Sequence, residues 1–330
     1  MSENTVLRRK TILIFGISSF VGSSLAEFFK KDFRVVGTYN DTPVSIPGVM
    51  AIPCSVLSKE EVQLVMFSTR PDITIYAAGM SSIVDCALEE GRADALNTSG
   101  LFNVVEYCQR YKSQIIYISS CFVFSGEDKS YLEMDIPDPN TVYGRTQASA
   151  EFYIQKTSLN YLVFRSCKLY GRNISPKKNG WFEKLQDYTH FRKPMTVDDY
   201  VNIGFLDVNY LGMIIKMCLD KGIQNRLFQI SSADNMTYYE FAKTYAKVFG
   251  ETDHNLTKGK WSYPVMATAH AGTASSDNKL HFKLDLTNAE GFLNLKMPSI
   301  EESLEFTFRR LKGVKKENKK SDQGQGITFI

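Results

Sequence analysis

The 330-residue chain is 43% hydrophobic and 23% charged, values that are typical of soluble globular proteins. They exclude a disordered chain, a collagen-like fibre and a small disulfide-rich scaffold. Lys and Arg total 39 against 36 Asp and Glu, and the net charge of +3 is too small to indicate a nucleic-acid partner. No apolar run approaches the roughly 20 residues that a membrane span requires, so we expect no membrane partner.

The cysteines and histidines are scattered along the chain. The six cysteines include no CxxC pair, and the four histidines show no metal-ligand spacing. The sequence therefore predicts no metal site. Dispersed single cysteines are typical of a reducing compartment, so we expect a cytoplasmic protein.

The first half of the chain alternates apolar strand-like runs with helical patterns. Near-continuous apolar strands separated by helices predict an α/β fold with a doubly wound parallel sheet, the Rossmann arrangement. We expect strands at residues 11–15, 34–39, 50–52, 72–77, 114–118 and 161–165, and helices at residues 20–31, 60–67, 92–110 and 147–157.

After Gly171 this regular alternation stops. Residues 227–231 are strand-like, and residues 238–249 form an amphipathic helical pattern. Residues 255–277 show no clear period. A last helix is expected at residues 299–310, where Ser299 and Glu302 have the spacing of a capping box.

The change of pattern sets the predicted domain boundaries. We predict a Rossmann domain over residues 10–171, to which residues 199–231 return. A smaller C-terminal α/β lobe is expected from residues 172–198 and 232–312.

The positive charge is concentrated at the C-terminal end. Residues 309–320 hold seven basic residues and one acid, a charge of +6, which leaves −3 for the rest of the chain. We expect residues 313–330 to form a basic, flexible tail. Because the folded body is mildly acidic, it must bind anionic ligands through local donors, and a nucleic-acid partner is not expected.

A glycine-containing turn lies between the first predicted strand and the first predicted helix. Gly16 permits a tight turn, and Gly22 permits close packing of helix on strand. The pyrophosphate of a dinucleotide binds backbone N–H groups at a helix N-terminus of this kind. Ser19 replaces the middle glycine of a GxxGxxG pattern, and it would either weaken the site or supply a hydroxyl donor. The sequence predicts that a dinucleotide is bound by Gly16, Ser18, Ser19, Phe20, Val21 and Gly22.

The residues after the second strand bear on the choice of dinucleotide. Asn40 lies where an acidic residue would accept the ribose 2′-hydroxyl of NAD, but it is neutral, and Asp41 is one position late. A polar turn explains the pair equally well. The cofactor is therefore expected to be NADP or NAD, with NADPH slightly preferred.

Later segments place polar residues at the ends of the predicted strands. Residues 77–79 (Ala-Ala-Gly) end the fourth strand, Asn97 lies in the following helix, and Ser120 follows the fifth strand. Residues 141–147 read Thr-Val-Tyr-Gly-Arg-Thr-Gln, and residues 164–171 read Phe-Arg-Ser-Cys-Lys-Leu-Tyr-Gly. In this order the segments resemble the extended short-chain dehydrogenase/reductases, and most closely the dTDP-4-dehydrorhamnose reductases and related nucleotide-sugar reductases. The resemblance covers nearly the whole folded chain.

The resemblance implies a role for each matching residue. Ser120 matches the residue that hydrogen-bonds the substrate carbonyl or hydroxyl, and Tyr143 matches the tyrosine that transfers a proton as hydride moves. Asn97 and the turn Ala77, Ala78 and Gly79 match positions beside the cofactor. A phenol next to a serine hydroxyl can protonate an oxygen that becomes an alkoxide, so these residue types suit carbonyl reduction.

Gln147 departs from the family's Tyr-x-x-x-Lys motif, in which the lysine holds the nicotinamide ribose and lowers the tyrosine pKa. An amide keeps hydrogen bonding but supplies no cation. Because a free tyrosine titrates near about 10, Tyr143 should stay protonated at neutral pH. A protonated tyrosine can still serve as the acid in a reduction, whereas an oxidation or an epimerisation needs the phenolate. Gln147 therefore argues against an efficient epimerase and leaves room for a protein that only binds.

The candidates for contact with the substrate are Ser81, Cys121, Phe122, Lys168 and Trp181. Cys121 replaces the aspartate of the reductases and is either a reactive thiol or a buried small hydrophobe. Lys168 would bind a diphosphate, restore positive potential near the catalytic tyrosine, or be an exposed lysine without a role. Trp181 would stack on a base or sugar, or simply pack between domains.

Two function hypotheses follow. The first is an oxidoreductase, an NAD(P)H-dependent reductase of a 4-keto nucleotide sugar in deoxysugar or surface-polysaccharide biosynthesis, with Tyr143 as acid, Ser120 as carbonyl donor and Gln147 on the ribose. The second is a non-catalytic relative that binds cofactor or nucleotide sugar and regulates or scaffolds a partner. An epimerase or dehydratase is a further alternative. The resemblance also implies a homodimer that pairs the helices expected at residues 92–110 and 147–157.

Overall fold

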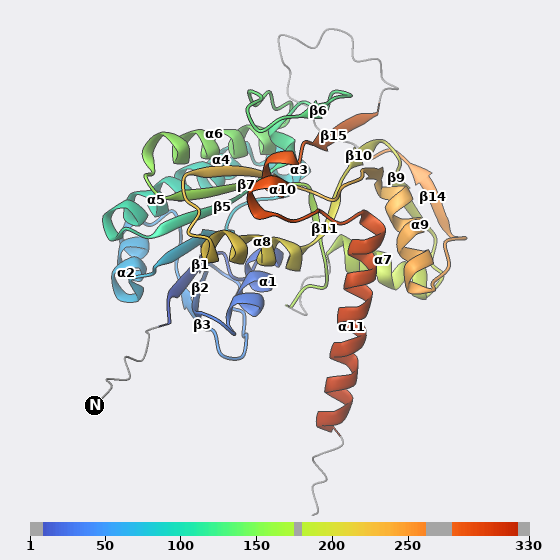
Figure 1. The fold of residues 1–330 in the computed structure, drawn as a ribbon, viewed down its shortest axis with the longest axis horizontal. Helices are drawn as coiled ribbons and strands as arrows, with labels where there is room; N and C mark the ends of the chain where they lie inside the picture. The colour runs from blue at the N-terminus through green and yellow to red at the C-terminus, as the bar shows by residue number, and fades with distance from the viewer. Residues whose placement is uncertain (1–8, 175–179, 262–278, 323–330) are drawn as a thin grey trace, which may run out of the picture.

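A seven-stranded parallel sheet forms the centre of the molecule in the computed structural model, which describes residues 9–174, 180–261 and 279–322 (Figure 1). The strand order is β12-β7-β5-β4-β1-β2-β3, and every neighbouring pair is parallel. The strands are β1 (Thr11–Phe15), β2 (Arg34–Tyr39), β3 (Met50–Pro53), β4 (Ile73–Tyr76), β5 (Gln114–Ser120), β7 (Tyr161–Ser166) and β12 (Arg226–Ile230). The predicted doubly wound Rossmann fold is confirmed.

Helices cover both faces of this sheet. On one face α1 (Phe20–Phe29) and α8 (Val208–Asp220) share an apolar core with the strands. On the other face the core contains α2 (Lys59–Thr69), α5 (Gly100–Tyr111) and α6 (Val142–Thr157). Strands covered on both sides need apolar residues at successive positions, which explains why every residue of β1 is buried.

A smaller lobe lies beside the central sheet (Figure 1). It contains a four-stranded sheet of order β13-β10-β15-β6 and the two-stranded pairs β11-β8 and β14-β9. Aromatic side chains dominate its core. Its strands are β6 (Ser130–Tyr131), β8 (Lys168–Tyr170), β9 (Met195–Asp198), β10 (Val201–Ile203), β11 (Phe205–Asp207), β13 (Met236–Thr237), β14 (Leu256–Gly259) and β15 (Leu280–Leu284), and its helices are α7 (Trp181–His190), α9 (Tyr238–Phe249) and α11 (Ile300–Asp322).

Two predicted helices differ from the structure. The helix expected over residues 92–110 is divided into α4 (Glu90–Asp94), a π-helical turn η1 (Ala95–Ser99) and α5. Helix α6 begins at Val142, five residues before the predicted start, because Thr141 caps it: its Oγ1 accepts a hydrogen bond from Gly144 N at 3.0 Å. Several elements were not predicted: α3 (Ile83–Leu88), the 3-10 turn η2 (Cys121–Val123), α7, α8, α10 (Thr287–Leu293) and the short strands of the smaller lobe.

Segments that are distant in sequence complete each lobe. Within residues 199–231, α8 and β12 join the Rossmann unit, whereas β10 pairs with β13 and β15 of the second sheet. Strand β6 also lies in that second sheet, although the sequence assigned it to the Rossmann domain. Ala289 and Leu293 of α10 pack into the core shared by α1 and α8. The two lobes are therefore interleaved along the chain.

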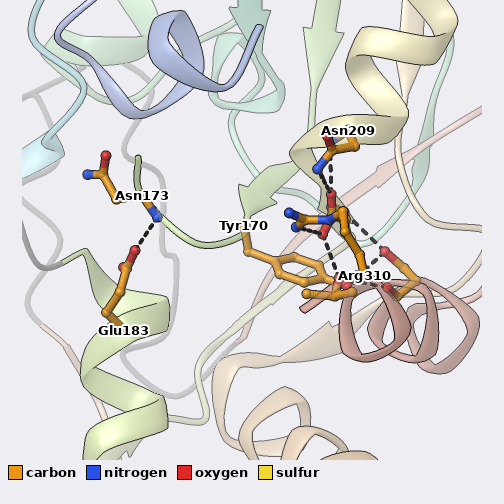
Figure 2. A network of polar contacts seen from close by, with 8 residues as sticks. Tyr170, Asn173, Glu183, Asn209 and Arg310 are labelled. Atoms are coloured by element: carbon orange, nitrogen blue, oxygen red, sulfur yellow. Dashed lines mark hydrogen bonds and ion pairs between the residues drawn. The ribbon is translucent and has the colours of Figure 1, made fainter. Parts of the chain in front are cut away.

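A buried polar network holds the last helix, α11, against the rest of the molecule (Figure 2). Arg310 Nη2 lies 2.9 Å from Asp207 Oδ2, and Thr307 Oγ1 donates to the same oxygen at 2.6 Å. Ser303 Oγ accepts hydrogen bonds from the Tyr170 hydroxyl at 2.8 Å and from Asp207 N at 3.0 Å. The fully buried Asp207 carboxylate is therefore already paired within the protein.

The ends of α11 can be compared with the sequence. Ser299 and Glu302 form the predicted capping box: Ser299 N donates to the Glu302 carboxylate at 2.7 Å, and Glu302 N donates to Ser299 Oγ at 3.2 Å. The backbone stays helical to Asp322, so residues 313–322 of the expected tail continue the helix. Residues 323–330 of that tail, and residues 262–277 of the segment without a clear period, lie outside the described residues. No described helix combines the length and apolar character that a membrane span requires.

Candidate functional site

Two clefts meet at the carboxyl ends of the central strands. The larger has a volume of about 550 Å³ and runs from the start of α1 past the ends of β4, β5 and β7 to the smaller lobe. The second, about 390 Å³, lies beside the ends of β1 and β2. Both clefts are lined by Ser19 and by the turn at residues 77–79, so they join at the glycine turn. Ligands of open α/β sheets bind at this position.

The glycine turn is closely packed. Gly16 has φ +84°, and a Cβ there would lie 2.5 Å from Ala78 N. A Cβ on Gly22 would lie 2.3 Å from the carbonyl oxygen of Gly16. Ser19 caps α1, since its Oγ accepts a hydrogen bond from Gly22 N at 3.0 Å. Ser19 thus supports the turn, while its hydroxyl hydrogen and the first N–H groups of α1 remain available to a ligand.

The second cleft contains the residues that bear on cofactor choice. Ser18, Asn40 and Asp41 line it, and Asn40 Nδ2 donates to Asp41 Oδ2 at 2.5 Å. Arg92 also lines it, although the sequence analysis did not identify this residue. Its guanidinium lies 2.9 Å from the Glu89 carboxylate and is largely exposed. A carboxylate and a guanidinium therefore lie at the same end of the cleft.

Asn97 is held by the protein on three sides. Its Oδ1 accepts from Met80 N at 2.8 Å, and its Nδ2 donates to the Met80 carbonyl at 3.0 Å and to Thr146 Oγ1 at 2.9 Å. Asn97 comes from the π-helical turn and lines the larger cleft. A Cβ on Gly79, which has φ +126°, would lie 2.3 Å from Asn97 Oδ1. Asn97 thus fixes the loop after β4 to α6, so its position beside the cleft has a structural basis.

Ser120 and Tyr143 lie together in the larger cleft. Ser120 is the last residue of β5, and Tyr143 lies in the first turn of α6. Burial raises the pKa of the Tyr143 hydroxyl above its ordinary value of 10, and the neighbouring Ser120 hydroxyl opposes this shift only in part. Tyr143 is therefore protonated at neutral pH, as expected from the loss of the family's lysine.

Gln147 lies one turn beyond Tyr143 on the same face of α6. It is 6% exposed, and its Oε1 accepts a hydrogen bond from the Tyr117 hydroxyl at 2.6 Å. Burial raises the pKa of Tyr117 well above its ordinary value, so this phenol keeps its proton and acts as the donor. The Gln147 amide is thereby fixed with its NH₂ group as the remaining donor in the cleft lining.

A buried ion pair anchors the next turn of α6. Arg165 Nε and Nη2 lie 3.0 and 2.8 Å from Glu151 Oε2, and both side chains are almost fully buried. Ser119 Oγ donates to Glu151 Oε1 at 2.5 Å. Tyr143, Gln147 and Glu151 are spaced by four residues and share one helix face. The pair therefore fixes the face that carries the cleft residues against β5 and β7.

Four of the predicted substrate residues line the larger cleft: Ser81, Cys121, Phe122 and Lys168. Cys121 is fully buried, and burial raises the pKa of its thiol, which favours a neutral, unreactive side chain. Burial likewise lowers the pKa of Lys168 below its ordinary value of 10.5. The Lys168 ammonium and the Cys121 thiol therefore have pKa values shifted in opposite directions by the same burial.

Trp181 is placed differently from its predicted substrate contact. Its ring packs 5.4 Å from Phe241 and 5.0 Å from Tyr238, in the core of the smaller lobe, and it does not line either cleft. Tyr238 and Trp261 line the larger cleft instead. These two residues reach the strand ends only because short strands that are distant in sequence pair in the smaller lobe. The linear sequence therefore held no signal for them.

The clefts suit a dinucleotide and offer little to a metal ion. The glycine turn leaves no room for side chains beneath a helix N-terminus, and farther along the same wall the Gln147 NH₂ group has no acceptor among the described residues. Within the described ranges no group of three or more His, Cys, Asp or Glu side chains could hold a metal ion.

The chain matches the RmlD substrate-binding domain family over residues 10–312. It belongs to this family. Among curated proteins it is 24% identical to methionine adenosyltransferase 2 subunit beta of Rattus norvegicus, an alignment that covers 78% of this chain and 77% of the relative. It is 29% identical to the dTDP-4-dehydrorhamnose reductase of Aggregatibacter actinomycetemcomitans over 48% of this chain and 52% of that protein.

Solved structures share the fold of this family member. The dTDP-4-dehydrorhamnose reductase of Bacillus anthracis in complex with NADP has a TM-score of 0.74 at 22% identity, covering 92% of this chain and 99% of that one. The UDP-glucose 4-epimerase of Thermotoga maritima with UDP-glucose has a TM-score of 0.75 at 19% identity, with the same coverage. The predicted resemblance to the extended short-chain dehydrogenase/reductases of the nucleotide-sugar branch is confirmed.

Proposed function

We propose that the protein is an NAD(P)H-dependent reductase of a 4-keto nucleotide sugar. One observation carries this proposal: Tyr143 and Ser120 lie together in a cleft that continues to the glycine turn at the start of α1. An acid, a hydroxyl donor and a dinucleotide-type turn are the parts that carbonyl reduction needs. Similarity to dTDP-4-dehydrorhamnose reductases supports the substrate class.

In the proposed reaction Ser120 donates a hydrogen bond to the substrate carbonyl oxygen. Tyr143 donates its proton to that oxygen as it becomes an alkoxide. The reduced nicotinamide, when bound, supplies the hydride. Because burial raises the pKa of Tyr143, the phenol is in the protonated form that reduction requires at neutral pH. The reverse oxidation needs the phenolate, so the site favours reduction.

Gln147 takes the place of the family's lysine. Tyr117 occupies its carbonyl oxygen at 2.6 Å, so the NH₂ group is directed to a ligand in the cleft. We propose that this group donates a hydrogen bond to a hydroxyl of the nicotinamide ribose. A neutral amide holds the ribose without lowering the tyrosine pKa, which is consistent with a slow reductase.

We propose NADPH as the preferred cofactor, with NADH as the weaker alternative. Arg92 lines the second cleft and offers a guanidinium to a ribose 2′-phosphate. Replacing it (Arg92→Ala) is expected to raise KM for NADPH about tenfold and to leave KM for NADH unchanged. An equal change for both cofactors would contradict the assignment.

Nicotinamide oxidation with a panel of 4-keto nucleotide sugars tests the reductase function. The native protein and a Gln147→Lys variant are assayed side by side. We expect slow turnover of at least one keto sugar by the native protein and faster turnover by the variant. If both forms bind cofactor and neither reduces any keto sugar, the reductase proposal fails.

The second candidate is a binding protein that serves as a subunit of an assembly. Gln147 favours it, because the missing cation weakens catalysis, and so does the similarity to methionine adenosyltransferase 2 subunit beta over most of the chain. A copurifying partner enzyme whose activity changes with this chain, together with no keto-sugar reduction, would select this candidate.

We also propose a homodimer that pairs α5 and α6 of two copies. Phe102 of α5 and Tyr153 of α6 stack with ring centroids 3.8 Å apart, and the adjacent Phe152 is 67% exposed. An exposed aromatic beside a helix pair is suited to burial in an interface. Analytical ultracentrifugation should show a dimer that Phe152→Glu converts to a monomer.

A further inference from the structure

The larger cleft has an unusual distribution of charge. Its described lining consists of serines, tyrosines, an asparagine, a glutamine, thiols and apolar side chains, and Lys168 is the only charged residue among them. Lys168 is partly exposed, and the space that exposes it is this cleft. A single cation therefore faces the cleft without a carboxylate in the described wall.

The position of Lys168 follows from strand pairing. It begins β8, lies opposite Phe205 of β11 in the parallel register, and its backbone N donates to the Gly204 carbonyl at 3.0 Å. The hydrogen bonds between β8 and β11 thus fix the backbone of Lys168, and the residue lines the cleft at the start of β8. No residue within the described ranges forms a hydrogen bond or ion pair with its amine.

The neighbouring groups do not neutralise this cation. The titratable groups that interact electrostatically with the Lys168 ammonium are the thiols of Cys121 and Cys167. Burial raises the pKa of Cys167 to about 11 and that of Cys121 further, so both thiols stay neutral near pH 7. Of the buried acids on surrounding elements, Glu151 is paired with Arg165 and Asp207 with Arg310, and Asp198 accepts hydrogen bonds from Val201 N and Trp261 N at 3.0 Å each.

A partly buried ammonium that has no partner among the described residues is costly, and a ligand oxygen can supply the missing charge. We propose that Lys168 is the recognition site for an anionic group of the substrate, a phosphoryl or carboxylate oxygen, next to the catalytic Ser120–Cys121 turn. The inference rests on the proposed function only in taking this cleft as the substrate cleft. It makes charge, rather than sugar shape alone, a determinant of specificity.

Two sources could supply the anion: the diphosphate of a nucleotide sugar or a carboxylate on the sugar itself. Both present oxygens that an ammonium binds as a point charge. A sugar without either group lacks the partner that Lys168 requires. The experiment therefore compares ligands that differ only in these charges.

The test is a calorimetric titration, in the absence of substrate turnover, with UDP, UDP-glucose, UDP-glucuronic acid, dTDP-glucose and uncharged uridine and thymidine. We expect Lys168→Met to weaken binding of the charged probes at least tenfold and Lys168→Arg to retain affinity within about threefold. Lys243→Met, which removes an exposed lysine of α9 outside the cleft, is the matched control and should change affinity less than twofold. Thermal melting confirms that each variant is folded.

The outcomes separate the two sources and the two proposals. Equal weakening for UDP-glucose and UDP-glucuronic acid assigns the diphosphate, and weakening for UDP-glucuronic acid alone assigns the sugar carboxylate. The inference is overturned if Lys168→Met binds every charged probe as tightly as the native protein, or if the native protein binds none of them. If Lys168→Met loses affinity and the native protein reduces no keto sugar, this inference stands and the reductase proposal fails. If the native protein reduces a keto sugar and Lys168→Met keeps its affinity, the reductase proposal stands and this inference fails.

Discussion

The two sides of the larger cleft differ in how their polar groups are satisfied. On the proposed cofactor side, formed by the glycine turn, the loop after β4 and α6, Ser19, Asn97 and Gln147 each form hydrogen bonds to the protein. On the proposed substrate side, formed by β8 and the smaller lobe, Lys168 has no partner within the described residues. The first side is preorganised, and the second holds a charge that no carboxylate of the described lining neutralises. The polar groups of the first wall therefore stabilise the fold, whereas the charge of the second wall is available to bind a ligand.

The largest expected effect is on the acid of the cofactor side. Tyr143→Phe removes the proton donor and should lower kcat for keto-sugar reduction by about 10²–10⁴-fold, the range of general acid–base catalysis, with little change in KM. Tyr153→Phe, on the same helix but outside the clefts, is the control. Steady-state kinetics measures both variants. Full activity of Tyr143→Phe would remove this residue from the mechanism.

The next largest effect is expected on the free energy of unfolding, when the buried ion pair that anchors α6 is broken. Glu151→Gln leaves Arg165 buried without its counter-ion and should lower the free energy of unfolding by about 3–5 kcal/mol. Glu301 forms an exposed pair with Lys247 at 2.8 Å, so Glu301→Gln should cost less than about 1 kcal/mol. Urea denaturation compares the two. Similar losses in both variants would show that the buried pair does not anchor the cofactor side.

The sequence predicted most of the residues that line the proposed cofactor side of the clefts, because they lie in short motifs at strand ends. Gly16, Ser120 and Tyr143 each follow or precede a strongly patterned element, and parallel strands bring such ends to one edge. The hydrogen bond from Tyr117 to Gln147 was not predictable, since Tyr117 reads as one more apolar strand residue. The Tyr117 hydroxyl reaches Gln147 only because α6 packs on β5.

The substrate side was less predictable for a physical reason. Trp261 and Tyr238 reach the cleft through pairing of short strands that are distant in sequence, and strands of two to four residues carry almost no periodic signal. Trp181 shows the converse: from sequence alone an aromatic side chain is equally suited to a ligand or a core, and here it packs in the core. Lys168 was a candidate, but its isolation required knowing where every nearby carboxylate lies.

The charge on the substrate side predicts a pH dependence. Burial lowers the pKa of Lys168 from 10.5, so affinity for an anionic ligand should fall as pH rises through this lowered pKa. The unfolded chain binds more protons in that range, so the contribution of Lys168 to the free energy of unfolding rises with pH. The thiols of Cys121 and Cys167, which face it, titrate at about 11 or above.

Comparison with Lys168→Met isolates this group. The variant should bind anions weakly at every pH from 7 to 10 and should be about 1–3 kcal/mol more stable than the native protein at pH 7, because a partly buried charge without a partner among the described residues is removed. Denaturation and titration at several pH values measure both effects. A native protein whose affinity stays level across this range would place the ammonium in solvent and contradict the isolation of Lys168.

The smallest effect tests how the cofactor side orients Gln147. Tyr117→Phe removes one hydrogen bond, worth about 1 kcal/mol, so cofactor affinity should fall about fivefold with the fold intact. Tyr107 donates to Gln63 Oε1 at 3.1 Å away from the clefts, so Tyr107→Phe is a matched control that should leave affinity unchanged. If Tyr117 acts through Gln147, adding Tyr117→Phe to Gln147→Ala should have no further effect on affinity. An additional fivefold loss in that background would mean that Tyr117 contacts the cofactor itself and that Gln147 is not oriented by it.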